Sequence, residues 1–139
     1  YMKRSISGRI RELDEEEDRL LDNLVEYQRK YYVEGSIGEE VFNSKKSSIE
    51  DSITDIEETR QSLRTKRRSL LPLSQAIEDV GEERDRVVDE IRELQKRYYK
   101  KSDVGEMVFN TRMDNLSSRL TEIEKEDLAL KLEEWRENR

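Results

Sequence analysis

The stretch QRKYYVEGSIGEEVFN at residues 28–43 returns at residues 95–110 as QKRYYKKSDVGEMVFN. The offset of 67 residues between these two stretches holds without a gap through nearly the whole chain. Apolar residues that it aligns include Ile10 with Ile77, Leu24 with Ile91, Phe42 with Phe109, Ile56 with Ile123 and Leu63 with Leu130. Similarity at a fixed period indicates repeated structural units, so the chain is a tandem duplication.

Apolar residues on both sides of each stretch step by three and four residues, which is the heptad spacing of coiled-coil helices. The first seam of each copy runs into the start of the stretch; it consists of Ile6, Ile10, Leu13, Glu17, Leu20, Leu24, Tyr27 and Tyr31, and in the second copy of Leu73, Ile77, Val80, Arg84, Val87, Ile91, Leu94 and Tyr98. The second seam of each copy begins at the end of the stretch; it consists of Phe42, Ile49, Ile53, Ile56, Arg60, Leu63, Arg67 and Leu70, and in the second copy of Phe109, Met113, Leu116, Leu120, Ile123, Asp127, Leu130 and Glu134. Each copy is therefore predicted to hold two amphipathic helices.

The middle of each stretch predicts a turn between the two helices. Gly35 suits the left-handed backbone conformation that ends a helix, and Ser102 holds its place in the second copy. Pro72 separates the copies, because proline lacks the N–H that would continue a helix. We therefore predict an all-α fold: a tandem duplication of two antiparallel coiled-coil helical hairpins with four long helices. The first hairpin repeat spans residues 1–70 and the second spans residues 71–139.

The sequence leaves two arrangements of the hairpins open. A narrow heptad seam suits a separate two-stranded coil, whereas the helices of a bundle need a wider apolar face. The apolar face widens near the repeated stretches, through Leu21, Val25, Tyr32 and Val41, and through Val88, Tyr99, Met107 and Val108. We favour hairpins that pack on each other there, within one chain or between chains, and an up-down four-helix bundle is one form of that packing.

Composition favours long helices and argues against several kinds of function. Charged residues make up 44% of the chain and apolar residues 32%, a balance that suits a narrow seam rather than a wide core. There is no cysteine and no histidine, which removes disulfides, thiol nucleophiles, imidazole bases and the usual zinc ligands. Narrow coils also offer no pocket that would shift the pKa of paired carboxylates. We therefore expect a protein that is not an enzyme and that needs no cofactor or metal.

The net charge of −7 repels nucleic acids and anionic membranes, so we expect neither as the default partner. No apolar run approaches the ~18 residues of a membrane span, and we expect a cytoplasmic protein. The alternative is the soluble juxtamembrane part of a membrane protein, because Tyr1, Lys3 and Arg4 resemble the aromatic and basic residues that follow a span. A membrane would then be reached only through segments outside this chain.

Two seam positions change sign together between the repeats. Glu17 and Arg60 lie about one helical turn apart when the first hairpin is folded about its turn, and the corresponding residues are Arg84 and Asp127. A joint reversal of charge predicts ion pairs that fix the register of the helices. The alternative is chance in a highly charged chain. We expect the pairs to be half-exposed, so that each contributes only ~0–1 kcal/mol to stability.

The repeated stretches are also candidate binding surfaces. Their aromatic residues are Tyr31, Tyr32, Phe42, Tyr98, Tyr99 and Phe109. The alternative, which we favour, is that these residues close the end of each hairpin. The second stretch adds four cations, Lys96, Arg97, Lys100 and Lys101. A basic and aromatic mixture of this kind is able to stack on single-stranded nucleic acid or to touch lipid headgroups, but cations at a helix C-terminus explain it more simply.

Two runs of like charge lie elsewhere in the first repeat. The acidic run from Asp14 to Asp18 faces further carboxylates of the same hairpin and has no expected basic partner there. We expect it to form a solvated face, with arginines of the second hairpin as the alternative partners. A basic run that includes Arg64 and Arg67 closes the second helix, and we expect a solvated helix end, because cations are favoured at that position.

A second apolar stripe lies near the C-terminal end of the sequence. Leu128, Leu132 and Trp135 step by four and three residues on a face away from the seam that Ile123 and Leu130 mark. An exposed tryptophan on such a stripe indicates a contact outside the hairpin. We expect its partner to be the first helix of the same chain or another subunit.

The segment GSIGEEVF at residues 35–42, followed by Lys45, Lys46 and Ile49, resembles the G-x-I-T-x-E-E-F-x-x-x-K-x-x-L pattern of SHOCT-like short helical hairpins. Gly38 stands here where that family usually has threonine or serine. The resemblance covers the part of each repeat around its turn. It implies an interaction or oligomerisation module, with no catalytic or binding residues to carry over.

These features predict a non-catalytic protein–protein interaction, oligomerisation or scaffold module of a larger protein. We expect its partner to be another protein or a second copy of the chain, which would make it a homo-oligomer. The juxtamembrane region is the first alternative, and a nucleic-acid-binding helical module is the second.

Overall fold

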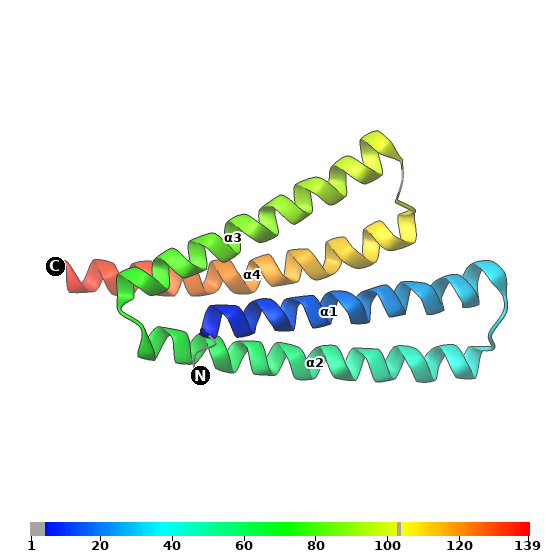
Figure 1. Cartoon of the computed structure of the whole chain (residues 1–139), viewed down its shortest axis with the longest axis horizontal. Helices are drawn as coiled ribbons and strands as arrows, with labels where there is room; N and C mark the ends of the chain where they lie inside the picture. Colours follow the sequence, from blue (N-terminus) through cyan, green and yellow to red (C-terminus); the bar gives the residue numbers. More distant parts are fainter. Residues whose placement is uncertain (1–4, 103) are drawn as a thin grey trace. The chain divides into compact units, whose positions relative to one another are not determined.

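A computed structural model describes residues 5–102 and 104–139. Within these ranges it contains four α-helices, two π-helical turns and no strand. The helices are α1 (Ile6–Gln28), α2 (Glu39–Leu70), α3 (Leu73–Lys96) and α4 (Glu106–Glu137), and the π-helical turns are η1 (Arg29–Glu34) and η2 (Arg97–Lys101). Figure 1 shows that α1 and α2 run antiparallel as one hairpin, and that α3 and α4 form a second. The predicted all-α fold of two helical hairpins is confirmed.

Both hairpins turn at the repeated stretch with the same backbone geometry. Each π-helical turn is followed by one residue in the left-handed conformation, Gly35 (φ 63°) after η1 and Ser102 (φ 55°) after η2. The N–H of Gly35 donates to the carbonyl of Lys30, and that of Ser102 donates to the carbonyl of Arg97. Glycine adopts this conformation freely, whereas a residue with a Cβ loses about 1–2 kcal/mol. The second repeat thus keeps the predicted turn without its glycine.

Local signals account for the other helix ends. The hydroxyl of Ser5 accepts a hydrogen bond of 2.9 Å from the N–H of Gly8, which caps the start of α1. Pro72 separates α2 from α3, and its carbonyl accepts the N–H of Ala76 at 3.0 Å, which begins the helical hydrogen bonding of α3. The break predicted at this proline is confirmed.

By its packing, the chain divides into two units, one up to Leu63 and one from Arg64. The division lies inside α2, so the last turns of that helix belong with α3 and α4. We term these unit one and unit two. The packing of both hairpins into one up-down bundle stays a prediction.

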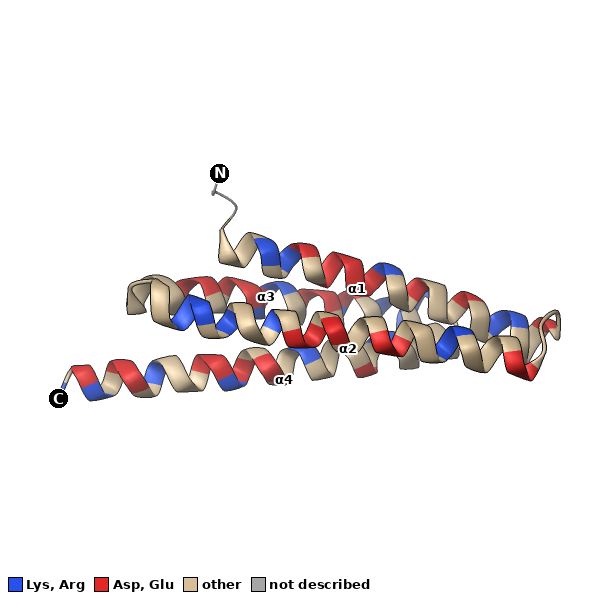
Figure 2. Ribbon diagram, turned by 90° about the horizontal axis from the view of Figure 1, so that it is seen from below, with Lys and Arg blue, Asp and Glu red and all other residues tan. Residues whose placement is uncertain are grey.

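Each unit has a narrow apolar seam, as the heptad pattern indicated. The buried apolar residues of unit one are Ile10, Leu13, Leu21, Leu24, Val25, Phe42, Ile49 and Ile56, and those of unit two are Ala76, Val80, Val87, Leu94, Leu116, Ile123 and Leu130. Charged residues of both signs cover the helices (Figure 2), but some of them lie within the seam. The buried charged residues are Asp14, Glu17, Arg60, Arg64, Arg67, Glu83, Arg119 and Glu126.

Candidate interaction surfaces and buried ion clusters

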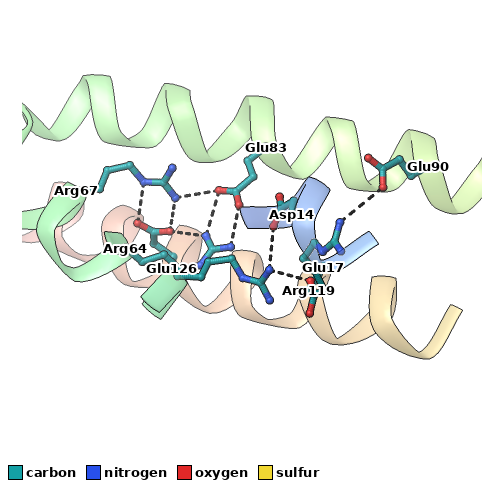
Figure 3. Close-up of polar contacts among 9 residues, drawn as sticks. Asp14, Glu17, Arg64, Arg67, Glu83, Glu90, Arg119 and Glu126 are labelled. Atoms are coloured by element: carbon teal, nitrogen blue, oxygen red, sulfur yellow. Dashed lines mark hydrogen bonds and ion pairs between the residues drawn. The ribbon is translucent and has the colours of Figure 1, made fainter. Parts of the chain in front are cut away.

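The first group of buried charges joins α1 to α2. Nη1 of Arg60 lies 2.9 Å from Oδ1 of Asp14 and 2.9 Å from Oε1 of Glu17. Asp14 and Glu17 are three residues apart, so successive turns of α1 present both carboxylates to one guanidinium (Figure 3). We term Asp14, Glu17 and Arg60 cluster one.

The structure brings Glu17 and Arg60 together, as the reversal of charge predicted, but it corrects two other expectations. The pair is not half-exposed, because the exposed fraction is 0% for Glu17 and 1% for Arg60. The acidic run also has a basic partner in its own hairpin, since Asp14 is buried and its Oδ1 accepts a hydrogen bond from Nη1 of Arg60. Removing one member of such a buried pair typically costs about 3–5 kcal/mol, not the ~0–1 kcal/mol of an exposed pair. The role of the pair in fixing register stays a prediction.

The corresponding residues of the second repeat belong to other ion pairs. Arg84 is exposed, and its Nε lies 3.8 Å from a carboxylate oxygen of Glu124. Asp127 instead lies 3.0 Å from Nζ of Lys131, one turn further along α4. Both residues line an open, polar cavity of unit two, whose lining consists of Gly81, Arg84, Asp85, Glu124, Asp127 and Lys131. The layer that is buried in the first repeat is therefore solvated in the second.

Unit two buries a different set of charges, one residue earlier in each helix. Glu83 of α3 and Glu126 of α4 face Arg64 and Arg67, which extend from the last turns of α2 (Figure 3). Arg64 lies 2.8 Å from Glu83 and 2.9 Å from Glu126, and Arg67 lies 2.9 Å and 2.5 Å from the same two carboxylates. Two guanidinium groups and two carboxylates thus balance each other in a buried layer. We term these four residues cluster two.

The pKa shifts in cluster two favour its ionic form. Burial alone would raise the pKa of Glu83, because desolvation disfavours a carboxylate. The charges and hydrogen bonds of Arg64 and Arg67 outweigh burial and hold the pKa of Glu83 below its ordinary value of 4.5. Burial would likewise lower the pKa of Arg67, but Glu126 and Glu83 raise it above its ordinary range. Glu83 and Arg67 are therefore both charged at neutral pH.

Sequence reasoning missed cluster two for a specific reason. It transferred the charged seam position from the first repeat and so placed Arg84 and Asp127 in the seam. The seam of a heptad repeat alternates steps of three and four residues. In α3 the buried seam steps by three residues from Val80 to Glu83 and then by four to Val87. The same shift by one residue selects Glu126 in α4.

The basic end of α2 was also misjudged. We expected the basic run to form a solvated helix end, although the heptad pattern also placed Arg67 in the seam, and the structure buries both Arg64 and Arg67. Their spacing of three residues places both guanidinium groups on one face of α2. The acidic residues Glu83 of α3 and Glu126 of α4 occupy matching seam positions, and this match is the signal that could have identified them as the partners of the two arginines.

Arg119 is a further buried cation of unit two. Its Nη2 donates to Oδ1 of Asn115 at 2.8 Å, one turn earlier in α4. Its Nη1 lies 3.8 Å from the partly exposed carboxylate of Glu90 in α3. Within unit two, the guanidinium of Arg119 therefore contacts the neutral amide of Asn115 and the partly exposed carboxylate of Glu90.

The repeated aromatic residues lie together at the end of each hairpin. In both, a tyrosine stacks face to face on the phenylalanine, with ring centroids 4.6 Å apart for Tyr31 and Phe42 and 4.1 Å apart for Tyr98 and Phe109. The second tyrosine of each pair contacts the same phenylalanine edge-on. Its ring is largely exposed, by 64% for Tyr32. We term residues 28–43 tip one and residues 95–110 tip two.

The predicted apolar stripe of α4 is exposed. Leu128, Leu132 and Trp135 keep between 45% and 68% of their surface accessible. Every residue from 131 to 139 is exposed, and both views show the C-terminal turns of α4 extending past the start of α3 (Figures 1 and 2). The predicted contact of this stripe with the first helix would join unit two to unit one, and it stays a prediction. We term these three residues the α4 stripe.

Repeat one provides an internal comparison for the α4 stripe. The residues of α2 that correspond to the stripe at the offset of 67 are Gln61, Thr65 and Arg68. All three are exposed on a helix of the same length and the same place in its hairpin. The hairpin fold therefore does not require apolar residues at these positions.

Other kinds of site find little support in the described residues. Among them, no helix combines the length and the apolarity needed to cross a membrane. Residues 5–102 and 104–139 likewise contain no group of three or more carboxylates arranged to hold a metal ion. Tyr1, Lys3 and Arg4, which motivated the juxtamembrane alternative, lie outside the described residues. No protein-family model, curated protein or solved structure matches this chain.

Proposed function

We propose that the chain is a non-catalytic, coiled-coil interaction module that associates with itself or with a protein partner through the α4 stripe. It would act as an oligomerisation or scaffold segment of a larger protein in the cytoplasm. The resemblance of tip one to SHOCT-like hairpins agrees with this proposal.

The single observation that carries the proposal is the exposure of the α4 stripe. A leucine pair and the one tryptophan of the chain lie on a helix face that the fold leaves open. Tryptophan is enriched among the residues that dominate binding energy at interfaces. Because the counterpart face of α2 is polar, folding of the hairpin does not explain these residues.

The test replaces the α4 stripe by its counterpart residues from repeat one. This stripe variant carries Leu128→Gln, Leu132→Thr and Trp135→Arg. The native chain is expected to gain mass in light scattering as its concentration rises from micromolar to millimolar, whereas the stripe variant is expected to keep the mass of one chain. Because α2 folds with the same three residues, the far-ultraviolet circular dichroism of the variant should remain helical.

A matched control removes an exposed leucine outside the stripe. Leu70 is 70% exposed at the end of α2, and Leu70→Gln is expected to associate as the native chain does. A native chain that stays monomeric throughout, or a stripe variant that associates as strongly as the native chain, would contradict self-association through this surface.

A further inference from the structure

We infer that the occupant of the α4 stripe is tip one of a second copy of the chain. This inference rests on the proposed function and names the partner surface. It would make the contact heterologous, with a different surface contributed by each copy. The argument depends on the charges around the two exposed apolar patches.

The α4 stripe is bordered by cations. Lys125 precedes Leu128 by three residues and Arg136 follows Leu132 by four, so both lie beside the stripe on the helix surface, and Arg139 follows just beyond the end of α4. In the described part of the chain, none of these three cations has an ion pair. Arg139 lies over the ring of Trp135, 4.7 Å from its centroid. Arg136 and Arg139 also suit a helix C-terminus, but that preference does not explain the adjacent tryptophan.

The acidic residues of the same segment lie on the other side of α4. Glu133, Glu134 and Glu137 fall about 120–180° around the helix from the centre of the stripe at 100° per residue. Glu124, which does border the stripe, is met by Arg84. The stripe therefore presents an apolar centre and a positive border.

Tip one presents the complementary surface. Tyr32, Val33 and Val41 are exposed by 47% to 69% around the turn of the first hairpin. Glu39 and Glu40 begin α2 directly beside them, and neither carboxylate has an ion pair among the described residues. Both cations of the same tip, Arg29 and Lys30, already have carboxylate partners in their own hairpin. Tip one is therefore an apolar patch with a negative border.

Tip two shares the fold of tip one but not its charge. Tyr99 corresponds to Tyr32 and is similarly exposed. The next two residues are Lys100 and Lys101, where tip one has Val33 and Glu34. A positive border repels tip two from the α4 stripe, because like charges in contact across an interface are unfavourable. Tip one is therefore the tip that fits.

Each copy then carries one donor tip and one receiving stripe. A heterologous contact of this kind adds copies one after another unless the rotation closes a ring. The native chain is therefore expected to grow beyond a dimer as its concentration rises. A stripe that paired with its own symmetry mate would stop at two copies.

The test mixes two variants that each lack one half of the contact. The stripe variant, with Leu128→Gln, Leu132→Thr and Trp135→Arg, keeps tip one. A tip variant, with Val33→Lys and Glu34→Lys, keeps the stripe and gives tip one the residues of tip two. Each variant alone is expected to have the mass of one chain in light scattering, and their equimolar mixture is expected to have twice that mass and no more.

The outcomes separate this inference from the proposed function. If the tip variant alone associates as the native chain does, or if the mixture stays monomeric while the native chain associates, the α4 stripe has a different occupant and the inference fails. If the native chain itself stays monomeric at millimolar concentration, self-association fails and the inference fails with it.

A charge-matched control and two fallback substitutions complete the experiment. Ser47→Lys with Glu50→Lys adds the same charge as the tip variant, at exposed residues of α2 outside tip one, and this control is expected to associate as the native chain does. If either multiple variant loses helical circular dichroism, the single substitutions Trp135→Arg and Val33→Lys replace it, with a smaller loss of association expected in the same direction.

Discussion

Arg60 shows what one side chain contributes when apolar residues are scarce. Its aliphatic stem lies in the seam, and its guanidinium joins two carboxylates of the neighbouring helix. The head group is 1% exposed, so water does not screen these contacts as it would at the surface. Such a buried pair adds little net stability compared with apolar residues of the same size, but each partner depends strongly on the other.

This dependence predicts a non-additive response to charge reversal. Glu17→Lys alone places two cations against each other in a buried layer and is expected to lower the free energy of unfolding by about 3–5 kcal/mol. Adding Arg60→Glu restores opposite charges and is expected to recover part of the loss, although Asp14 remains beside the new carboxylate. Urea unfolding followed by circular dichroism measures both changes.

The neighbouring Glu16 serves as the control, because it is exposed on the same helix. Glu16→Lys is expected to change the free energy of unfolding by less than about 1 kcal/mol. Equal midpoints for Glu17→Lys and the double reversal would show that Glu17 and Arg60 are not coupled.

At the scale of the helices, the heptad pattern predicted much of the fold and only part of the charged layers. The four helices, the turn at Gly35 and the break at Pro72 follow from local rules, because steps of three and four residues, a left-handed glycine and a missing N–H act within a few residues. The pairing of Glu17 with Arg60 followed from comparing the repeats. The buried position of Glu83 did not follow from that comparison. Whether residue 83 or residue 84 lies in the seam depends on which face of α3 packs against α2 and α4.

Cluster two predicts how unit two responds to acid. The folded pKa of Glu83 lies below the 4.5 of the unfolded chain, so its contribution to stability is fully present above pH 4.5. It is lost as the pH falls from about 4.5 through the folded pKa, because the unfolded state then binds the proton first. Thermal unfolding of the native chain and of Glu83→Gln across this range is expected to show the two curves converging as the pH falls.

Other carboxylates titrate in the same range, so the difference between the two proteins carries the information. Glu82→Gln removes an exposed carboxylate from the adjacent position and is expected to leave the pH profile of the native chain unchanged. A constant separation between the native and Glu83→Gln curves down to the acid limit would contradict the depressed pKa of Glu83.

At the scale of the whole molecule, the sequence repeat and the packing units end at different residues. The repeats meet near Pro72, but the units divide after Leu63. The last turns of α2 therefore supply unit two with Arg64 and Arg67, the partners of its buried carboxylates. By sequence, α2 belongs to the first repeat, but its last turns pack within unit two.

This division predicts different stabilities for two fragments. The fragment of residues 64–139 keeps cluster two, whereas the fragment of residues 71–139 lacks Arg64, Arg67 and the α2 turns that contact Glu83 and Glu126. Because the shorter fragment loses the charge partners of both carboxylates, the longer fragment is expected to unfold at a higher urea concentration at pH 7. The longer fragment with Arg64→Met and Arg67→Met should lose this advantage, and equal midpoints for the two native fragments would refute the assignment of the α2 end to unit two.

The opposite signs of Glu17 and Arg60 and of their counterparts Arg84 and Asp127 also bear on how the chain folds. A tandem duplication gives every helix a wrong partner that resembles the right one, and such mispaired hairpins act as kinetic traps during folding. If α1 paired with α4, Glu17 would meet Asp127, and if α3 paired with α2, Arg84 would meet Arg60. Both mistakes would place a like charge against Glu17 or Arg60, which the native hairpin buries, so we expect the reversal between the repeats to disfavour mispaired hairpins during folding.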